Sequence, residues 1–179
     1  NLSEGMNGHF NHLGNLGSPR INRIFMERKD EHQFMFLNPM DQFFVETDQF
    51  RFYNTKSPFM NVAYNTCGNK TTGDDHVKVT FARNVGKNFN FGGIFDYMYG
   101  QGYYNSQSTS HMNASAFGSY TADRYNLHFY YQHNYMKLAE NGGIEDEKYI
   151  TRPEDLSQKY NPSDIPTLLT RTWNKQEHD

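Results

Sequence analysis

The amino-acid sequence predicts an all-β protein, a transmembrane antiparallel up-and-down β-barrel, from three observations. The first is residues 125–135, YNLHFYYQHNY, where aromatic or aliphatic side chains alternate with mainly polar ones. This period of two places the two sets on opposite faces of a strand. The segment also has the length of about 9–11 residues that a tilted strand needs to cross a bilayer. The other two observations are the composition and the lengths of the connections.

The composition is rich in aromatic side chains and poor in aliphatic ones. The 179 residues are 36% hydrophobic and 16% aromatic, and the mean hydropathy is −0.90. A typical globular domain is about 45–50% apolar, whereas a disordered chain would lack the aromatic residues. The net charge of −3 offers no basic field to nucleic acid, so no nucleic-acid partner is expected. This balance favours strands with one polar and one aromatic face.

Residue counts exclude an internal disulfide framework and a helical membrane span. The single cysteine, Cys67, cannot form a disulfide within this sequence. The longest apolar runs, such as FMFL and FFV, fall far short of the roughly 18 residues of a membrane-spanning helix.

Six segments are expected to be strands. Alternation is clear in four of them, and two tight turns, GKN at 86–88 and DR at 123–124, join these four in pairs. Pro39 argues against a central strand in 33–45, and no element is predicted within residues 1–56. The expected strands are 58–66, 76–85, 89–100, 111–122, 125–135 and 167–173.

Short and long connections alternate along the chain. The long ones are expected at 67–75, 101–110 and 138–166. In an up-and-down sheet this alternation gathers short turns on one rim and long loops on the other, as in outer-membrane barrels. A soluble β-sandwich, with the aromatic face packed on a second sheet, would also explain the side-chain alternation. The loop asymmetry and the strand length favour the membrane barrel.

The histidines and acidic residues do not form a recognisable metal site. His128 and His133 are five residues apart, so a strand directs them to opposite faces. His76, His111 and His128 share a face only if the strand register allows it. The acidic segment 140–149 lacks the spacing of a calcium-binding loop and is expected to be solvated. No catalytic motif is present, and we expect no enzyme, no cofactor and no metal.

Five short motifs in this order resemble the putative porin family of Bacteroidota outer membranes. They are GNLGSP (14–19), FYNTKSP (52–58), YYNSQS (103–108), ENGGIED (140–146) and DIPTLLTRTWN (164–174). The resemblance implies a β-barrel in the outer membrane of a Gram-negative cell. It also implies that members are longer than this chain. Residues 1–179 would then form the N-terminal portion of a single barrel domain. The expected partners are then outer-membrane lipid, and further strands or other outer-membrane proteins.

The alternation and the resemblance together predict a role for each face. We expect a barrel that passes small polar solutes, with the loop 138–166 on the extracellular side. A plugged barrel that scaffolds an outer-membrane assembly, and a soluble carbohydrate-binding β-sandwich using Tyr103 and Tyr104, are the alternatives. The side chains expected to face lipid are Phe89, Phe91, Phe95, Tyr97, Tyr99, Leu127, Phe129 and Tyr131, and those expected to line the pore are Asn90, Asp96, Asn126, His128, Gln132 and Asn134.

Overall fold

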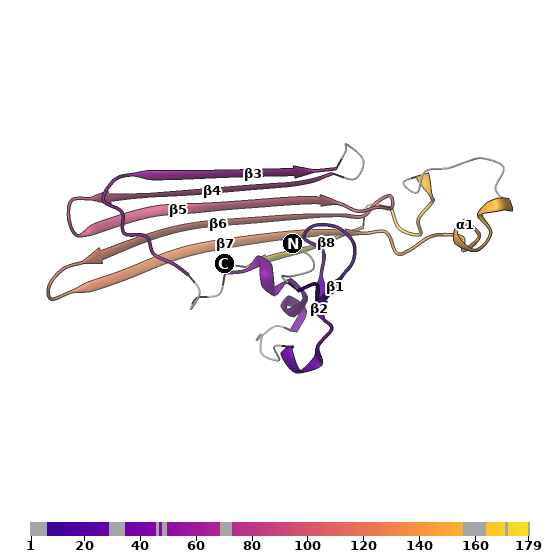
Figure 1. Cartoon of the computed structure of the whole chain (residues 1–179), viewed down its shortest axis with the longest axis horizontal. Coiled ribbons are helices and arrows are strands. Elements are labelled where there is room, and N and C mark those ends of the chain that lie inside the picture. Colours follow the sequence, from indigo (N-terminus) through magenta and orange to yellow (C-terminus); the bar gives the residue numbers. More distant parts are fainter. Residues whose placement is uncertain are drawn as a thin grey trace.

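A six-stranded antiparallel sheet dominates the computed structural model (Figure 1). The structure describes residues 7–28, 35–45, 47, 50–68, 73–155, 164–170 and 172–178. Each strand pairs with the next one in the sequence, in the order β3-β4-β5-β6-β7-β8. The strands are β3 Phe59–Cys67, β4 Asp74–Val85, β5 Phe89–Gln101, β6 Ser108–Thr121, β7 Asn126–Glu140 and β8 Thr172–His178. This confirms the predicted all-β, up-and-down architecture. Within the described residues the sheet is open, with β3 and β8 at its edges.

Several predicted boundaries were wrong at the loop end of the sheet. β4 begins at Asp74 and not at residue 76, and β6 begins at Ser108 and not at residue 111. The loop expected to begin at Leu138 begins at Asn141, because β7 continues through Glu140. Leu138 and Ala139 are buried, and this stretch of β7 pairs with β8. The last strand, expected at 167–173, lies at Thr172–His178. Its charged sequence shows no apolar alternation, so only pairing with β7 reveals it.

The register separates the side chains of the sheet into two faces. Phe95 lies opposite Val79 on β4 and Ala114 on β6, whereas Asp96 lies opposite Lys78 and Asn113. Adjacent strands keep this register, so the same alternation runs across the whole sheet. We call the side that carries Phe95 the aromatic face and the side that carries Asp96 the polar face.

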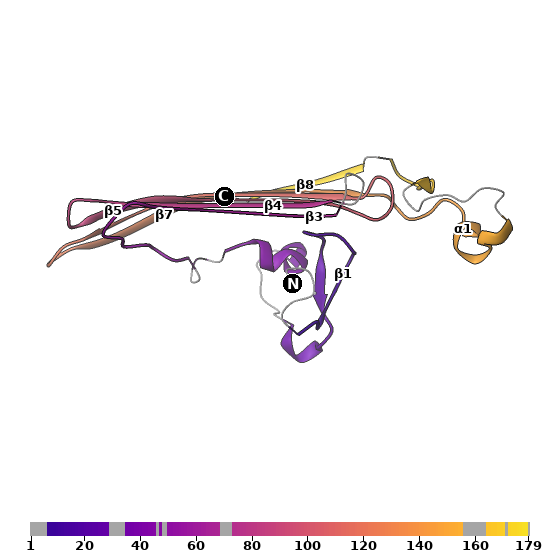
Figure 2. The same cartoon turned by 45° about the horizontal axis from the view of Figure 1, so that its top comes forward.

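The N-terminal part of the chain forms a second layer on one side of the sheet (Figure 2). We call the described residues between 7 and 57 the covering segment. It contains the hairpin of β1 (Phe10–His12) and β2 (Arg20–Asn22) and two 3-10 helices, η1 (Phe25–Glu27) and η2 (Met35–Phe43). Pro39 lies inside η2, as expected of a residue unsuited to a central strand.

An apolar core lies between the covering segment and the loop end of the polar face. Met40 and Phe43 of η2 pack with Met98, Met136 and Leu138 of the sheet, and all five are buried. Leu16, Leu37 and Phe44 pack around this cluster. The sheet side chains in this core lie on the polar face. The covering segment therefore shields from water the apolar side chains of a face that is otherwise mostly polar.

The connection between β7 and β8 extends beyond the end of the sheet (Figure 1). It contains α1 (Lys148–Thr151) and the 3-10 helix η4 (Pro153–Asp155), and Ile144 forms an isolated β-bridge with Thr167. None of the helices in the described ranges is long and apolar enough to cross a membrane.

The contact between Gly118 and Phe129 predicts a local packing requirement. The two residues lie directly opposite each other, and a Cβ on Gly118 would come within 2.7 Å of Phe129 Cε1. Gly118→Val should therefore displace the ring, which is 52% exposed and can move outward, and lower the free energy of unfolding by about 1 kcal/mol. Ala116→Val, at an exposed position on the same strand and face, should change it by less than about 0.5 kcal/mol. Equal midpoints of urea unfolding for the two variants would contradict this packing.

Candidate functional site

The polar face and the covering segment together form the candidate site, and hydrogen bonds attach the segment at the loop end. Asn15 donates from Nδ2 to Thr109 Oγ1 at 3.1 Å and to the Gly100 carbonyl at 3.4 Å. The Thr109 hydroxyl donates in turn to the Leu16 carbonyl. Asn15 and Thr109 are buried, so these bonds satisfy polar groups that water does not reach.

His111 is the centre of this attachment. Its Nε2 lies 2.5 Å from the Gly17 carbonyl oxygen, and its ring stacks on Phe43 with the centroids 4.5 Å apart. Gly17 has a φ of +81°, and a Cβ there would lie 2.6 Å from His111 Cδ2. The close approach and the left-handed backbone both require glycine at this position. The motif GNLGSP therefore forms a turn shaped to lie against His111.

An aromatic cluster attaches the segment near the middle of the sheet. Phe50 stacks on Tyr130 with centroids 4.5 Å apart, and Phe52 packs edge-on against Phe117 and His128. The Tyr130 hydroxyl donates to Thr47 Oγ1 at 2.8 Å. Stacked and edge-to-face pairs of this kind add stability beyond the area that they bury.

Amide hydrogen bonds complete the attachment near the short-turn end. Asn84 Nδ2 donates to Asn54 Oδ1 at 2.8 Å, and Asn84 Oδ1 accepts the backbone N–H of Thr55 at 3.3 Å. Asn90 also donates to Asn84 Oδ1. The covering segment thus follows the polar face from the loop end to the turn at residues 86–88.

One charged cluster lies on the part of the polar face formed by β4 and β5. Asp96 Oδ1 lies 2.7 Å from His76 Nε2, and Asp96 Oδ2 lies 3.1 Å from Lys78 Nζ. The Asp96 side chain is 19% exposed, whereas that of Lys78 is 51% exposed. Both carboxylate oxygens therefore have partners, and the lysine is the member of the cluster most open to solvent.

The side chains singled out from the sequence divide between the faces as the alternation predicts. The register puts the eight expected to face lipid on the aromatic face and the six expected to line the pore on the polar face. Their contacts with lipid or solute stay predictions. Asn90, Gln132 and Asn134 are buried, and Gln132 donates to Asn134 Oδ1 at 3.1 Å. These three lie within the wall, whereas the exposed polar residues of this face include Asn126 and His128 of β7, Asn61 and Asn65 of β3, and Lys78 of β4.

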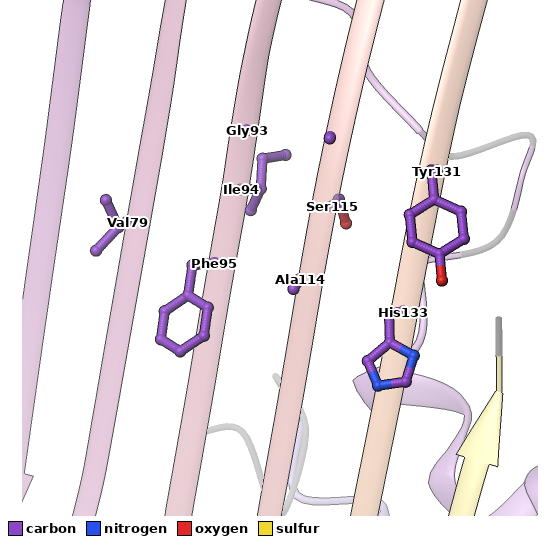
Figure 3. Close-up of a pocket in the computed structure, with 9 residues that line it drawn as sticks. Val79, Gly93, Ile94, Phe95, Ala114, Ser115, Tyr131 and His133 are labelled. Atoms are coloured by element: carbon purple, nitrogen blue, oxygen red, sulfur yellow. The ribbon is translucent and has the colours of Figure 1, made fainter.

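A hollow of about 430 Å³ lies on the aromatic face (Figure 3). Small residues, among them Gly93, Ala114 and Ala116, form its floor, and Phe95 and Tyr131 stand on either side. The hollow exists because small residues lie between aromatic residues of neighbouring strands.

The histidines and acids do not converge. His76, His111 and His128 share the polar face but lie on three different strands, and His133 lies on the aromatic face. In the described part of the chain, no three His, Cys, Asp or Glu side chains are placed to hold a metal ion. In the acidic loop, Asp146 accepts the backbone N–H of Lys148 at 3.0 Å and lies 3.4 Å from its ammonium. That backbone hydrogen bond, aided by the lysine charge, lowers the pKa of Asp146.

The family of the chain follows from its whole length. A family model described as putative porin matches residues 1–179. The chain belongs to the putative porin family. No curated protein and no solved structure matches this porin chain. Its family membership implies an outer-membrane location and a porin-like transport role.

The covering segment was missed by sequence reasoning. Residues 1–56 carry little alternation, and the side chains of the covering segment are placed by contacts with strands that lie far away in the chain. The motifs GNLGSP and FYNTKSP were the available signal, since both contain residues that touch the polar face of this porin.

Loss of the His111 ring should release the covering segment. His111→Ala removes the stack on Phe43 and the bond to Gly17, which together should contribute about 1–3 kcal/mol to docking. We expect trypsin to cleave after Arg20, Arg23 or Arg28 at least about fivefold faster. His133→Ala, on the opposite face, is the control. Unchanged cleavage in both variants would show that His111 does not hold the segment.

Proposed function

We propose that this chain forms part of the wall of a β-barrel in the outer membrane of a Gram-negative bacterium, and that its N-terminal segment lies in the lumen and limits passage to small polar solutes. The observation that carries this proposal is the separation of the two faces. The aromatic face exposes Phe129 and Tyr131, whereas the covering segment packs on the polar face.

The dimensions of the aromatic face support a membrane position. From Phe89 to Tyr99, at about 3.3 Å per residue, β5 is about 33 Å long, which a tilt of about 40° reduces to a height of about 25 Å. That is the height of the apolar band of outer-membrane barrels. Tyrosines lie near both ends of this face, with Tyr64 and Tyr97 at the loop end and Tyr120 at the turn end. Tyrosine side chains favour the two membrane interfaces.

A soluble sandwich requires its second layer on the aromatic face. In the described ranges the second layer lies on the polar face (Figure 2). This placement favours the barrel over the carbohydrate-binding sandwich. The expected partners are outer-membrane lipid on the aromatic face, and further strands at the β3 and β8 edges, since an open edge in a membrane leaves backbone groups without hydrogen bonds.

The covering segment restricts the passage. It packs over parts of β5, β6 and β7 and contacts the short-turn ends of β3 and β4. It leaves Asn61, Ala63 and Asn65 of β3 exposed beside Lys78. A solute would therefore pass along the β3–β4 side of the wall. The same segment favours the plugged scaffold as the second candidate function, in which the segment closes the lumen completely.

A charge placed on each face separates the two environments. Phe95→Arg, at the middle of the aromatic face on β5, should lower the stability of the assembled barrel by about 2–4 kcal/mol. Asn61→Arg, exposed on the polar face, should have little effect on assembly. Heat-dependent gel migration and urea titration of protein extracted from the membrane measure both. Similar small effects would contradict the proposed orientation.

Displacing the segment distinguishes a restricted pore from a closed plug. Gly17→Val places a side chain against His111 and should loosen the segment. In planar bilayers the native protein should conduct, and the variant should conduct more. A native protein that stays closed while Gly17→Val opens it would favour the plugged scaffold. If neither protein conducts, the transport proposal fails.

A further inference from the structure

We propose that the restricted passage selects small anions, and that Lys78, Arg51 and Lys56 determine this selectivity. This inference rests on the proposed function, because it assigns a solute class to the same lumen. It concerns the open part of the polar face and the adjacent stretch of the covering segment.

Lys78 presents a positive charge to the open side of the wall. Its neighbour Asp96 is mostly buried, and both of its carboxylate oxygens have partners, His76 on one side and Lys78 on the other. An ammonium has three donors and the Asp96 contact engages one of them, so Lys78 can donate to a passing anion. The carboxylate, in contrast, is mostly shielded from solvent, and each of its oxygens already has a partner. Asp96 thus positions Lys78 and offsets only part of its charge at the lumen.

Arg51 is exposed although its neighbours are packed. Phe50 and Phe52, on either side of it, pack on the sheet against Tyr130 and Phe117. The Arg51 guanidinium can bind carboxylate or phosphate groups through two parallel hydrogen bonds.

The three cations are placed at successive depths. Lys56 is exposed and follows Asn54 and Thr55, which bond to Asn84 near the short turn. Arg51 lies at the level of Phe117, which shares a row with Ala82, and Lys78 is four residues further along β4. At about 3.3 Å per residue, Lys78 is about 13 Å from that row along the strand. An anion entering from the short-turn end would therefore meet one cation after another.

The other acidic groups near this path do not outweigh its positive charge. Asp75 lies on the aromatic face, where it accepts the Tyr64 hydroxyl at 2.9 Å. Asp74 lies on the polar face at the far end of β4, partly buried beside Leu16 of the covering segment. Along the stretch from Lys56 to Lys78, the described charges open to solvent are cationic. This arrangement suits small carboxylates and inorganic phosphate, which match the donors of lysine and arginine.

The test is ion selectivity of the native protein in planar bilayers under a gradient of potassium chloride. We expect chloride to be more permeant than potassium. A unit charge about 8 Å from an ion in a water-filled lumen changes the population of that ion about twofold, raising it for chloride and lowering it for potassium. Lys78→Met should therefore lower the permeability ratio of chloride to potassium by up to about fourfold. Arg51→Gln should also lower this permeability ratio. Lys87→Met, in the exposed turn at the rim, is the matched control and should leave the ratio unchanged.

Two further measurements sharpen the result. Asp96→Asn should raise the permeability ratio, because the Lys78 charge is then unopposed. Inorganic phosphate added to the chloride solution should lower the chloride current of the native protein and do so less in Lys78→Met. A conducting protein whose selectivity is the same in native, Lys78→Met and Arg51→Gln forms would overturn this inference and leave the proposed transport intact. An absence of any conductance would overturn the transport proposal itself.

Discussion

The antiparallel register of β4, β5 and β6 is the constraint on which the rest of the structure depends. It places Phe95 in one row with Val79 and Ala114, and Asp96 in the next row with Lys78 and Asn113. Because side chains alternate with a period of two, a slip of one residue would exchange the faces of a whole strand. The register therefore keeps the aromatic residues together and brings the charged cluster together from two strands.

The polar face needs a second layer for a separate physical reason. Met98, Met136 and Leu138 lie on that face, and His111 and Thr109 lie beside them. Leaving these apolar side chains in water is unfavourable, and the covering segment buries them with Met40 and Phe43. The backbone carbonyls of Leu16 and Gly17 meet the polar groups at the same place. The covering segment thus buries the apolar side chains of the wall and also provides hydrogen-bond partners for its polar ones.

The covering segment leaves part of the polar face open, and this open part would determine the charge of the lumen. The segment packs on β5, β6 and β7 and on the short-turn ends of β3 and β4, while Lys78 and the rest of β3 stay open. Because Asp96 is held between His76 and Lys78, the open side carries positive charge without an exposed carboxylate beside it. Size restriction and charge preference would then come from the same arrangement, since the segment that narrows the passage also supplies Arg51.

Local sequence was sufficient for the strands with clear alternation. The hairpins around 86–88 and 123–124 were predicted because turn residues separate two alternating runs, and such signals act over a few residues. Alternation also assigned Phe129 and Gln132 to opposite faces before the register was known. The motifs were enough to indicate the family that the full-length match establishes.

Tertiary structure decided the features that depend on contacts between distant residues. β8 has no alternation and becomes a strand only by pairing with the end of β7, which itself extends further than its own pattern suggested. The covering segment owes its position to contacts such as that of Gly17 with His111, which are 94 residues apart in the chain. The pairing of Lys78 with Asp96 likewise required the register, because a sequence indicates which side of a strand a residue occupies but not which residue of the next strand lies opposite.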